Sequence, residues 1–280
     1  MIRTRIIVGT ILALAAGGIL VGDDHLAPGW FPCLFVCLMA LGVLAGRELV
    51  NLIPQPFKPS ECLVVTGTVL CLAANWVPVA LGSGAVWQLV VVVLAATLML
   101  ALLLEMHRFT GEVGVVVPRL GTTMLAVCYL GVLPCFFAQI RFLPHSHASL
   151  LLALTIFVPK CNDIAAFFTG TFLGRHKMTP VLSPKKTWEG FAGGMFGGVA
   201  VAVGTNFVQP IFPHGTLEAI GFGLAIGIAG ILGDLAESLI KRDCQTKDAS
   251  KSIPGFGGLL DVVDSVLFAA PVAYLWFSWK

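Results

Sequence analysis

Residues 86–104 read VWQLVVVVLAATLMLALLL and decide the fold class, because this stretch has no charged side chain and is long enough to cross a bilayer as a helix. The rest of the chain has the same character: of its 280 residues, 57% are hydrophobic and 11% are charged. A soluble domain has about 25% charged residues and could not cover so much apolar surface. The sequence therefore predicts an all-α, polytopic transmembrane protein.

Nine segments are apolar and long enough to be membrane spans of about 20 residues. We predict spans near residues 6–22, 31–52, 63–81, 86–104, 120–138, 148–172, 190–208, 218–237 and 259–279. The first could imitate a signal peptide, but no small-residue cleavage site follows it and many equally apolar segments come after it, so we interpret it as a span. The span near 148–172 is expected to be broken, because Pro159, Lys160 and Asp163 interrupt it.

The distribution of basic residues predicts an orientation. If the N-terminus is cytoplasmic, nine spans place all but three of the 17 Lys and Arg residues in cytoplasmic segments. The exceptions are Arg141, Lys160 and Lys280. Cytoplasmic loops hold the Lys and Arg excess of membrane proteins, so the span count and the cytoplasmic N-terminus agree with each other.

The two halves of the chain differ in polar content. Residues 1–150 contain apolar spans with short loops, and we predict that they form an N-terminal transmembrane scaffold. In residues 151–280 polar side chains enter the spans, which predicts a C-terminal catalytic transmembrane region. The net charge of +2 is too small to indicate nucleic-acid binding. The eight cysteines form no CxxC pair, and we interpret them as free, small apolar side chains.

Two polar clusters begin the second half. Lys160 and Asp163 lie at a depth where charge is costly, either as part of a site or as a pair that only neutralises itself. Next, Ser183-Pro-Lys-Lys-Thr-Trp-Glu-Gly190 contains Lys185 and Lys186, which can hold phosphates as point charges. The alternative for this loop is a positively charged surface that faces anionic lipid.

Two further clusters follow near the last two spans. Asp234, Glu237, Ser238 and Lys241 are spaced i, i+3, i+4 and i+7, so they share one helix face, and carboxylate ligands of this kind suit magnesium.

The last cluster joins Lys247-Asp248, the glycine-rich stretch 253–258, and Asp261 with Asp264. Glycines let the backbone approach a phosphate closely, although acidic residues early in a helix can also simply complement its dipole. Together the clusters offer carboxylates for a metal, basic groups for phosphates and a glycine turn, which is the equipment of phosphoryl chemistry. We expect Asp234 and Asp261 to meet around one divalent ion at the cytosolic face.

These residues resemble the phosphatidate cytidylyltransferase family, also called CDP-diglyceride synthase. The resemblance rests on Ser238-Leu-Ile-Lys241-Arg242, Lys247-Asp248, Pro254-Gly-Phe-Gly-Gly-Leu-Leu-Asp261 and Asp264-Ser265, with the Asp163 segment and the Ser183–Gly190 block upstream. It covers roughly residues 160–271. Two positions depart from the family pattern: Phe256 stands where the family usually has His, and Val262 where it usually has Arg. Phe256 cannot donate a proton, and Val262 cannot hold a phosphate.

The resemblance implies a magnesium-dependent nucleotidyltransferase of phospholipid synthesis that converts CTP and phosphatidic acid into CDP-diacylglycerol and pyrophosphate. It also implies a monovalent cation such as K⁺, without indicating its site. The setting would be a cell (inner) membrane with the active site cytoplasmic. The partners would be CTP, phosphatidic acid and the lipid bilayer, with a homodimer left open and no nucleic acid.

The resemblance also implies roles for individual residues. The catalytic residues would be Asp234, Asp261, Lys241, Lys247 and Asp248. Substrate would contact Ser183, Lys185, Lys186, Arg242, Ser238, Gly257, Gly258 and Asp163. The metal would be held by Asp234, Asp261 and Asp264. Orienting roles fall to Asp163, Glu237, Asp248 and Asp264.

Other functions stay open. One is a related isoprenoid-lipid cytidylyltransferase or polyprenol kinase, which would differ in the acceptor lipid. A second is a membrane transporter with Lys160 and Asp163 on its path, although a transporter should carry midplane polar residues in both halves. A third is an inactive homologue, which Phe256 and Val262 would explain.

Overall fold

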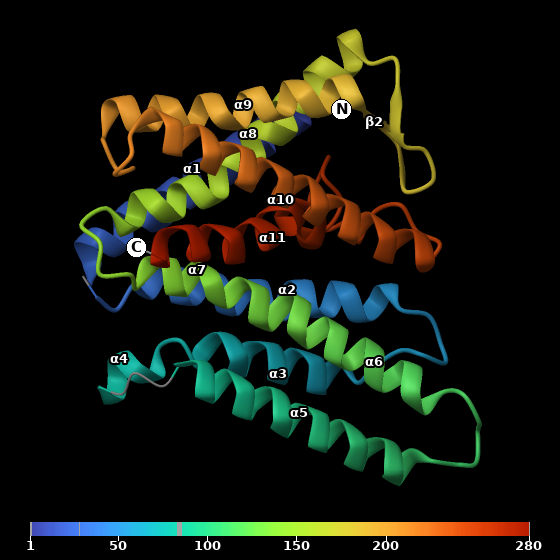
Figure 1. Ribbon diagram of the computed structural model, residues 1–280. Coiled ribbons are helices and arrows are strands. Elements are labelled where there is room, and N and C mark those ends of the chain that lie inside the picture. The colour runs from blue at the N-terminus through green and yellow to red at the C-terminus, as the bar shows by residue number, and fades with distance from the viewer. Residues whose placement is uncertain (1, 28, 83–85, 280) are drawn as a thin grey trace. The chain divides into compact units, whose positions relative to one another are not determined.

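A computed structural model of the protein describes residues 2–27, 29–82 and 86–279. Its elements in chain order are α1 (Ile2–Leu26), α2 (Pro32–Leu52), α3 (Glu61–Ala73), α4 (Val77–Leu81), α5 (Val86–Arg108), α6 (Val116–Val127), the π-helical turn η1 (Cys128–Val132), α7 (Leu133–Arg141), α8 (Ala148–Leu173), β1 (Lys177–Thr179), β2 (Ser183–Thr187), α9 (Trp188–Val208), α10 (Thr216–Asp243) and α11 (Leu259–Ser278) (Figure 1). Within the described residues, eight helical segments are long and apolar enough to cross a membrane, one of them continuous from α6 through α7. The prediction of an all-α, polytopic membrane protein is confirmed, and all eight cysteines are free.

The predicted span near 63–81 is divided in the structure. It consists of α3 and the short α4, separated by a turn in which the Asn75 side-chain amide donates to the carbonyl of Leu72 at 2.9 Å. At 1.5 Å per residue, α3 is about 20 Å long, which is shorter than the hydrocarbon core of a bilayer. Hydropathy could not reveal this turn, because the residues on both sides of it are apolar.

The predicted span near 148–172 differs in the opposite sense. The expected break is wrong, because α8 runs as one continuous helix from Ala148 to Leu173 with Pro159 inside it. The proline ring is accommodated by a glycine on the neighbouring helix: a Cβ atom at Gly230 of α10 would lie 2.8 Å from the Cβ of Pro159.

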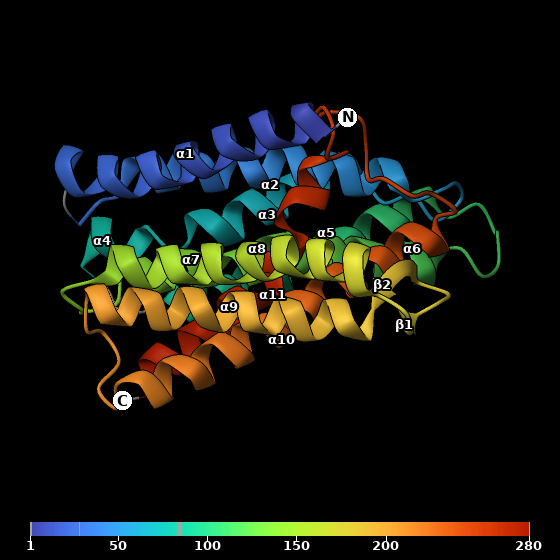
Figure 2. The same ribbon diagram turned by 90° about the horizontal axis from the view of Figure 1, so that it is seen from above.

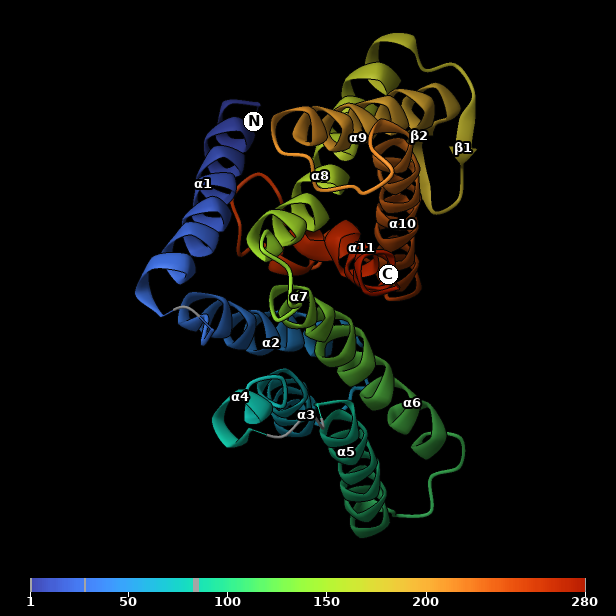
Figure 3. The same ribbon diagram turned by 60° about the vertical axis from the view of Figure 1, so that its left-hand side comes forward.

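The chain divides into two compact units, each described by itself. The first comprises Met1–Ala138 with Asp248–Asp261, and the second comprises Gln139–Lys247 with Val262–Lys280. In the first unit α3 packs against α2, α5, α6 and η1 (Figure 3). The contact is close at Gly131, where a Cβ atom would lie 3.1 Å from the Cβ of Cys71. The functional division into a scaffold (1–150) and a catalytic region (151–280) stays a prediction.

The second unit is built on the antiparallel pair α8 and α9, which lie side by side (Figure 2). The β1–β2 hairpin joins them, with Lys177 opposite Thr187 and Thr179 opposite Ser183. Glycines of α9 face α8: a Cβ at Gly197 would lie 2.5 Å from the Cβ of Ala165. Small residues of this kind let membrane helices approach closely.

Helix α10 packs on both α8 and α9, and it also meets α11. The rings of Phe222 on α10 and Phe277 on α11 have centroids 4.9 Å apart. Farther along, a Cβ at Gly233 would lie 2.5 Å from the backbone oxygen of Asp264. This close approach brings the residue after Gly233, Asp234, to the beginning of α11.

Candidate functional site

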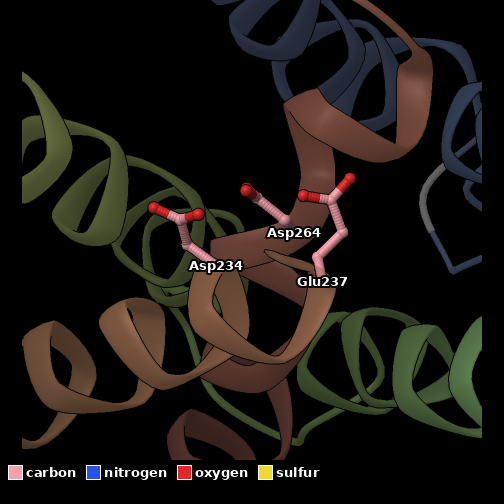
Figure 4. A group of neighbouring side chains, drawn as sticks. All are labelled: Asp234, Glu237 and Asp264. Atoms are coloured by element: carbon pink, nitrogen blue, oxygen red, sulfur yellow. The ribbon is translucent and has the colours of Figure 1, made fainter. Parts of the chain in front are cut away.

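Three carboxylates of the second unit form an acidic cluster. Asp234 and Glu237 project from α10 and Asp264 from α11, all toward the same side (Figure 4). One oxygen of each lies within 4.8 Å of the others, with Asp234 half-buried and the other two buried. The i, i+3 spacing places the first two on one face of α10, and the close contact at Gly233 brings α11 to that face.

Each carboxylate of the acidic cluster pairs with a lysine, and the three lysines lie on three different elements. Lys186 of β2 lies 2.8 Å from Asp234, and Lys241, one turn along α10, forms an ion pair with Glu237. Lys160 of α8 lies 3.4 Å from Asp264. The cluster therefore lies at the meeting point of three helices and the hairpin.

Lys160 is the centre of a wider network. Its Nζ lies 2.7 Å from the hydroxyl of Ser265 and 3.5 Å from Asp163, and Ser265 in turn donates to Asp163 at 2.9 Å. The interpretation of Lys160 and Asp163 as a self-contained pair is therefore incomplete, because both groups also contact α11.

The donor set of the acidic cluster fits a divalent cation. The network holds four carboxylates, on Asp163, Asp234, Glu237 and Asp264, and three ammonium groups, on Lys160, Lys186 and Lys241. Oxygen ligands are those that hard divalent ions prefer, and buried carboxylates are stable when they are paired or coordinate a metal. The lysines already offset part of the negative charge, so a bound cation would share these oxygens with them.

The hairpin carries several predicted substrate contacts. Ser183, half-buried, begins β2, Lys185 is exposed, and Lys186 reaches the acidic cluster. Arg242 donates from Nε to the carbonyl of Leu182 at 3.2 Å, which ties the end of α10 to the hairpin. In this structure Arg242 therefore positions the hairpin.

Two residues of the Ser183–Gly190 block hold the hairpin in place. The Thr187 hydroxyl accepts a hydrogen bond from the Gly190 N–H at 3.1 Å and so caps α9 at its beginning. The Glu189 carboxylate accepts from the backbone N–H of Arg175 at 3.0 Å, close to the start of the hairpin. These two bonds fix both ends of the hairpin that presents Lys185 and Lys186.

The glycine-rich segment and Asp261 belong to the first unit. Gly255 and Gly257 have φ angles of +85° and +112°, a region that favours glycine. The Asp261 carboxylate accepts from the N–H of Ala249 at 2.8 Å and of Gly258 at 2.6 Å. Asp261 therefore holds this turn closed in the structure.

The predicted metal ligands have different outcomes. Asp234 and Asp264 lie together, and they are joined by Glu237, to which the family resemblance assigned only an orienting role. Ser238 lies near them, with its hydroxyl 3.5 Å from Asp234. The predicted meeting of Asp261 with Asp234 stays a prediction. Lys247 and Asp248 are exposed, and their roles also stay predictions.

Two groups of the network, Glu237 and Lys160, have no direct role among the predicted metal ligands and substrate contacts. The i, i+3 spacing from Asp234 was the available signal for Glu237. For Lys160 the only signal was its position inside an apolar span, and its partners on α11 are more than 100 positions away in sequence.

The two departures from the family pattern have different environments. Phe256 lies next to α1, since a Cβ at Gly9 would be 3.5 Å from the end of its ring, so this phenylalanine makes an apolar contact. Val262 is half-buried at the start of α11, and nothing in the structure explains it.

Comparison with known proteins gives a match along the whole chain. The model of the "Cytidylyltransferase family" matches residues 3–279. The "Phosphatidate cytidylyltransferase 5, chloroplastic" of Arabidopsis thaliana is 29% identical over 97% of this chain and 71% of its own length. The "Phosphatidate cytidylyltransferase" of Bacillus subtilis is 35% identical over 56% of the chain and 57% of its own length.

A further relative carries no assigned activity. The "Uncharacterized protein YnbB" of Escherichia coli is 45% identical over 44% of the chain, and the match spans 40% of that protein's length. The chain thus spans between about two fifths and about seven tenths of the length of these three relatives.

Proposed function

Because the chain belongs to the cytidylyltransferase family, we propose that it transfers CMP from CTP to phosphatidic acid, giving CDP-diacylglycerol and pyrophosphate. A phosphate oxygen of phosphatidic acid would attack the α-phosphorus of CTP. The bond from that phosphorus to the oxygen bridging to the β-phosphate would break, and pyrophosphate would leave. The names of the Arabidopsis and Bacillus relatives support this choice of nucleotide and lipid.

The observation that carries the proposal is the acidic cluster with one lysine on each carboxylate. A triphosphate brings several negative charges, and carboxylates alone would repel it. Here ammonium groups lie within 2.8–3.4 Å of Asp234 and Asp264. A phosphate that approached a cation bound to these oxygens would also meet Lys186 or Lys160, which would favour its binding.

We propose Mg²⁺ as the ion, held by Asp234, Asp264 and Glu237, with Asp261 as the further ligand that the sequence predicts. When bound, magnesium would offset the charge that develops on the phosphate oxygens. Lys186 and Lys241 would neutralise the phosphates and Asp163 would orient Lys160. Arg242, Ser183 and Lys185 would keep the hairpin and its hydrogen-bond donors beside the substrate.

The protein is a multi-pass membrane protein, and we propose that its N-terminus and its site both face the cytoplasm of a cell membrane. This orientation requires α3 and α4 together to cross as a ninth span, in addition to the eight long apolar helices. The basic residues of the hairpin and of Lys241–Lys251 support this orientation, because cytoplasmic segments hold the Lys and Arg excess. A cytoplasmic site would also have direct access to CTP.

A lipid-dependent assay tests the proposal. The purified protein in detergent, with CTP, Mg²⁺ and phosphatidic acid, is expected to release pyrophosphate and to stop when EDTA is added. Asp234→Asn should reduce the rate by about 100- to 1,000-fold, as expected when a group that stabilises charge at the reacting centre is lost. The matched control is Asp243→Asn, an exposed aspartate on the same helix, which should keep the wild-type rate.

Assays with different acceptor lipids distinguish the proposed function from its alternatives. Release with an isoprenoid phosphate but not with phosphatidic acid would identify the related lipid cytidylyltransferase instead. No release with any lipid, from protein that elutes as a single folded species, would contradict the proposed function.

A further inference from the structure

We propose that Glu48 of α2, in the half of the chain predicted to be scaffold, is a positioning residue for the glycine-rich segment 249–260. The inference rests on the proposed function, since it assigns this segment to the binding of the CTP phosphates. All the contacts that carry it lie within the first unit.

The Glu48 carboxylate holds both ends of the segment. One oxygen accepts hydrogen bonds from the hydroxyl of Ser250 at 2.7 Å and from the hydroxyl of Ser252. The other accepts from the backbone N–H of Leu260 at 3.0 Å, in the first turn of α11. A single carboxylate thus links the start of the segment to the helix that follows it.

Asp261 makes a second link of the same kind. It binds the N–H groups of Ala249 and Gly258, so the two carboxylates together take five donors from a segment of twelve residues. A segment of this length with several glycines would lose much conformational entropy if it became ordered only on binding a ligand. Glu48 and Asp261 order it beforehand.

Gly258 supports the same conclusion. A Cβ atom at this position would lie 2.6 Å from the nearer Glu48 oxygen and 3.0 Å from the Cβ of Ala249. Gly258 is buried, so its missing side chain makes room for Glu48. Its role is therefore to admit the carboxylate that shapes the turn.

The position of Glu48 also limits where a phosphate can bind. The beginning of α11 carries the unpaired N–H groups that attract anions, but Leu260 N–H is already bound to Glu48. A phosphate would be repelled there, and the exposed Lys251 offers it a cationic contact within the segment instead.

The test combines kinetics with proteolysis. Glu48→Ala is expected to raise the KM for CTP about tenfold, because several hydrogen bonds that hold the segment are lost. Its kcat should stay within about twofold of wild type, because Glu48 does not touch the reacting atoms. Trypsin cleavage after Lys251 should become about tenfold faster, because the released segment opens more often.

Matched variants separate positioning from general damage. Glu48→Gln keeps an oxygen for Leu260 N–H and an amide that can donate to the serine hydroxyls, so it should restore most of the wild-type KM. Glu61→Gln removes a carboxylate from an exposed pair with Arg47, the neighbour of Glu48, and should match wild type in both assays. Adding Ser250→Ala and Ser252→Ala to Glu48→Ala should have no further effect on cleavage.

The outcomes of these assays separate a failure of the inference from a failure of the proposed function. Wild-type cleavage and wild-type KM in Glu48→Ala would overturn the inference, as would faster cleavage with an unchanged KM. If Glu48→Ala does not fold, Ser250→Ala with Ser252→Ala in the wild-type background replaces it. This variant loses two of the bonds to Glu48, so wild-type cleavage and a wild-type KM would overturn the inference. Absence of transferase activity in the wild type would contradict the proposed function, while cleavage of the variants would still test whether Glu48 holds the segment.

Discussion

The two units use their buried and half-buried carboxylates differently. In the first unit they accept hydrogen bonds from backbone N–H groups and hydroxyls, or they pair with an arginine. Asp23 accepts from the N–H groups of Cys33 and Leu34 at 2.7 and 2.9 Å, where α2 begins without a cap of its own. Glu105 pairs with Arg119 at 3.0 Å. Glu48 and Asp261 likewise hold backbone N–H groups.

In the second unit the carboxylates face one another. Asp234, Glu237 and Asp264 gather within 4.8 Å, although like charges repel and buried charge lowers stability. The lysines around them reduce this repulsion but do not separate the carboxylates. The carboxylates of the first unit thus stabilise its local structure, whereas those of the second unit gather where a bound cation would further reduce their mutual repulsion.

The largest effect is expected where this arrangement depends on a missing side chain. Gly233→Ala would place a Cβ 2.5 Å from the backbone oxygen of Asp264 and 3.0 Å from Phe268, so α10 and α11 must move apart. A displacement of about 1 Å at a reacting centre can reduce the rate about 100-fold. The rate of pyrophosphate release measures this reduction. Gly204→Ala on α9, where nothing lies within 4 Å, is the control, and equal rates for both variants would refute the expectation.

A smaller effect, on stability alone, is expected from the ion pair of the first unit. Glu105→Gln leaves Arg119 without its charged partner, which should destabilise the protein by about 1–3 kcal/mol. The midpoint of thermal unfolding in detergent should fall, while the KM and kcat of the folded protein stay unchanged. A change in KM without a change in the midpoint would show that the two units do not differ as described.

The smallest effect is expected at the start of α2. Asp23→Asn keeps one oxygen for the two N–H groups that the aspartate now binds, so the loss should be about 1 kcal/mol or less. It should be local. Hydrogen exchange at Cys33 and Leu34 should accelerate, while exchange in α10 should not change. Equal acceleration in both helices would mean that Asp23 stabilises more than the start of α2.

The sequence predicts the helices well because their signal is local: an apolar run such as 86–104 needs no partner to be recognised. It could not predict the turn at Asn75, whose bonds lie among equally apolar neighbours. Nor could it predict the continuity of α8 through Pro159, which packs against Gly230 of another helix.

The same contrast between local signals and contacts with distant elements applies to the candidate site. The face of Asp234 and Glu237 was visible in their spacing, but which carboxylate of α11 joins it depends on the register that Gly233 sets. Glu48 carried no signal, because a charged residue beside Arg47 at the end of a span is typical of a membrane interface. Its partners lie about 200 positions away in the chain.

The glycine contacts between α8 and α9 have a mechanical consequence. At Gly197 a methyl group would lie 2.5 Å from the Cβ of Ala165, so the missing side chain lets α9 pack directly on α8. The two helices and the hairpin between them should therefore move as one rigid body. Any movement of this pair would carry Lys160 and Lys186 together, because one lysine lies on α8 and the other on the hairpin.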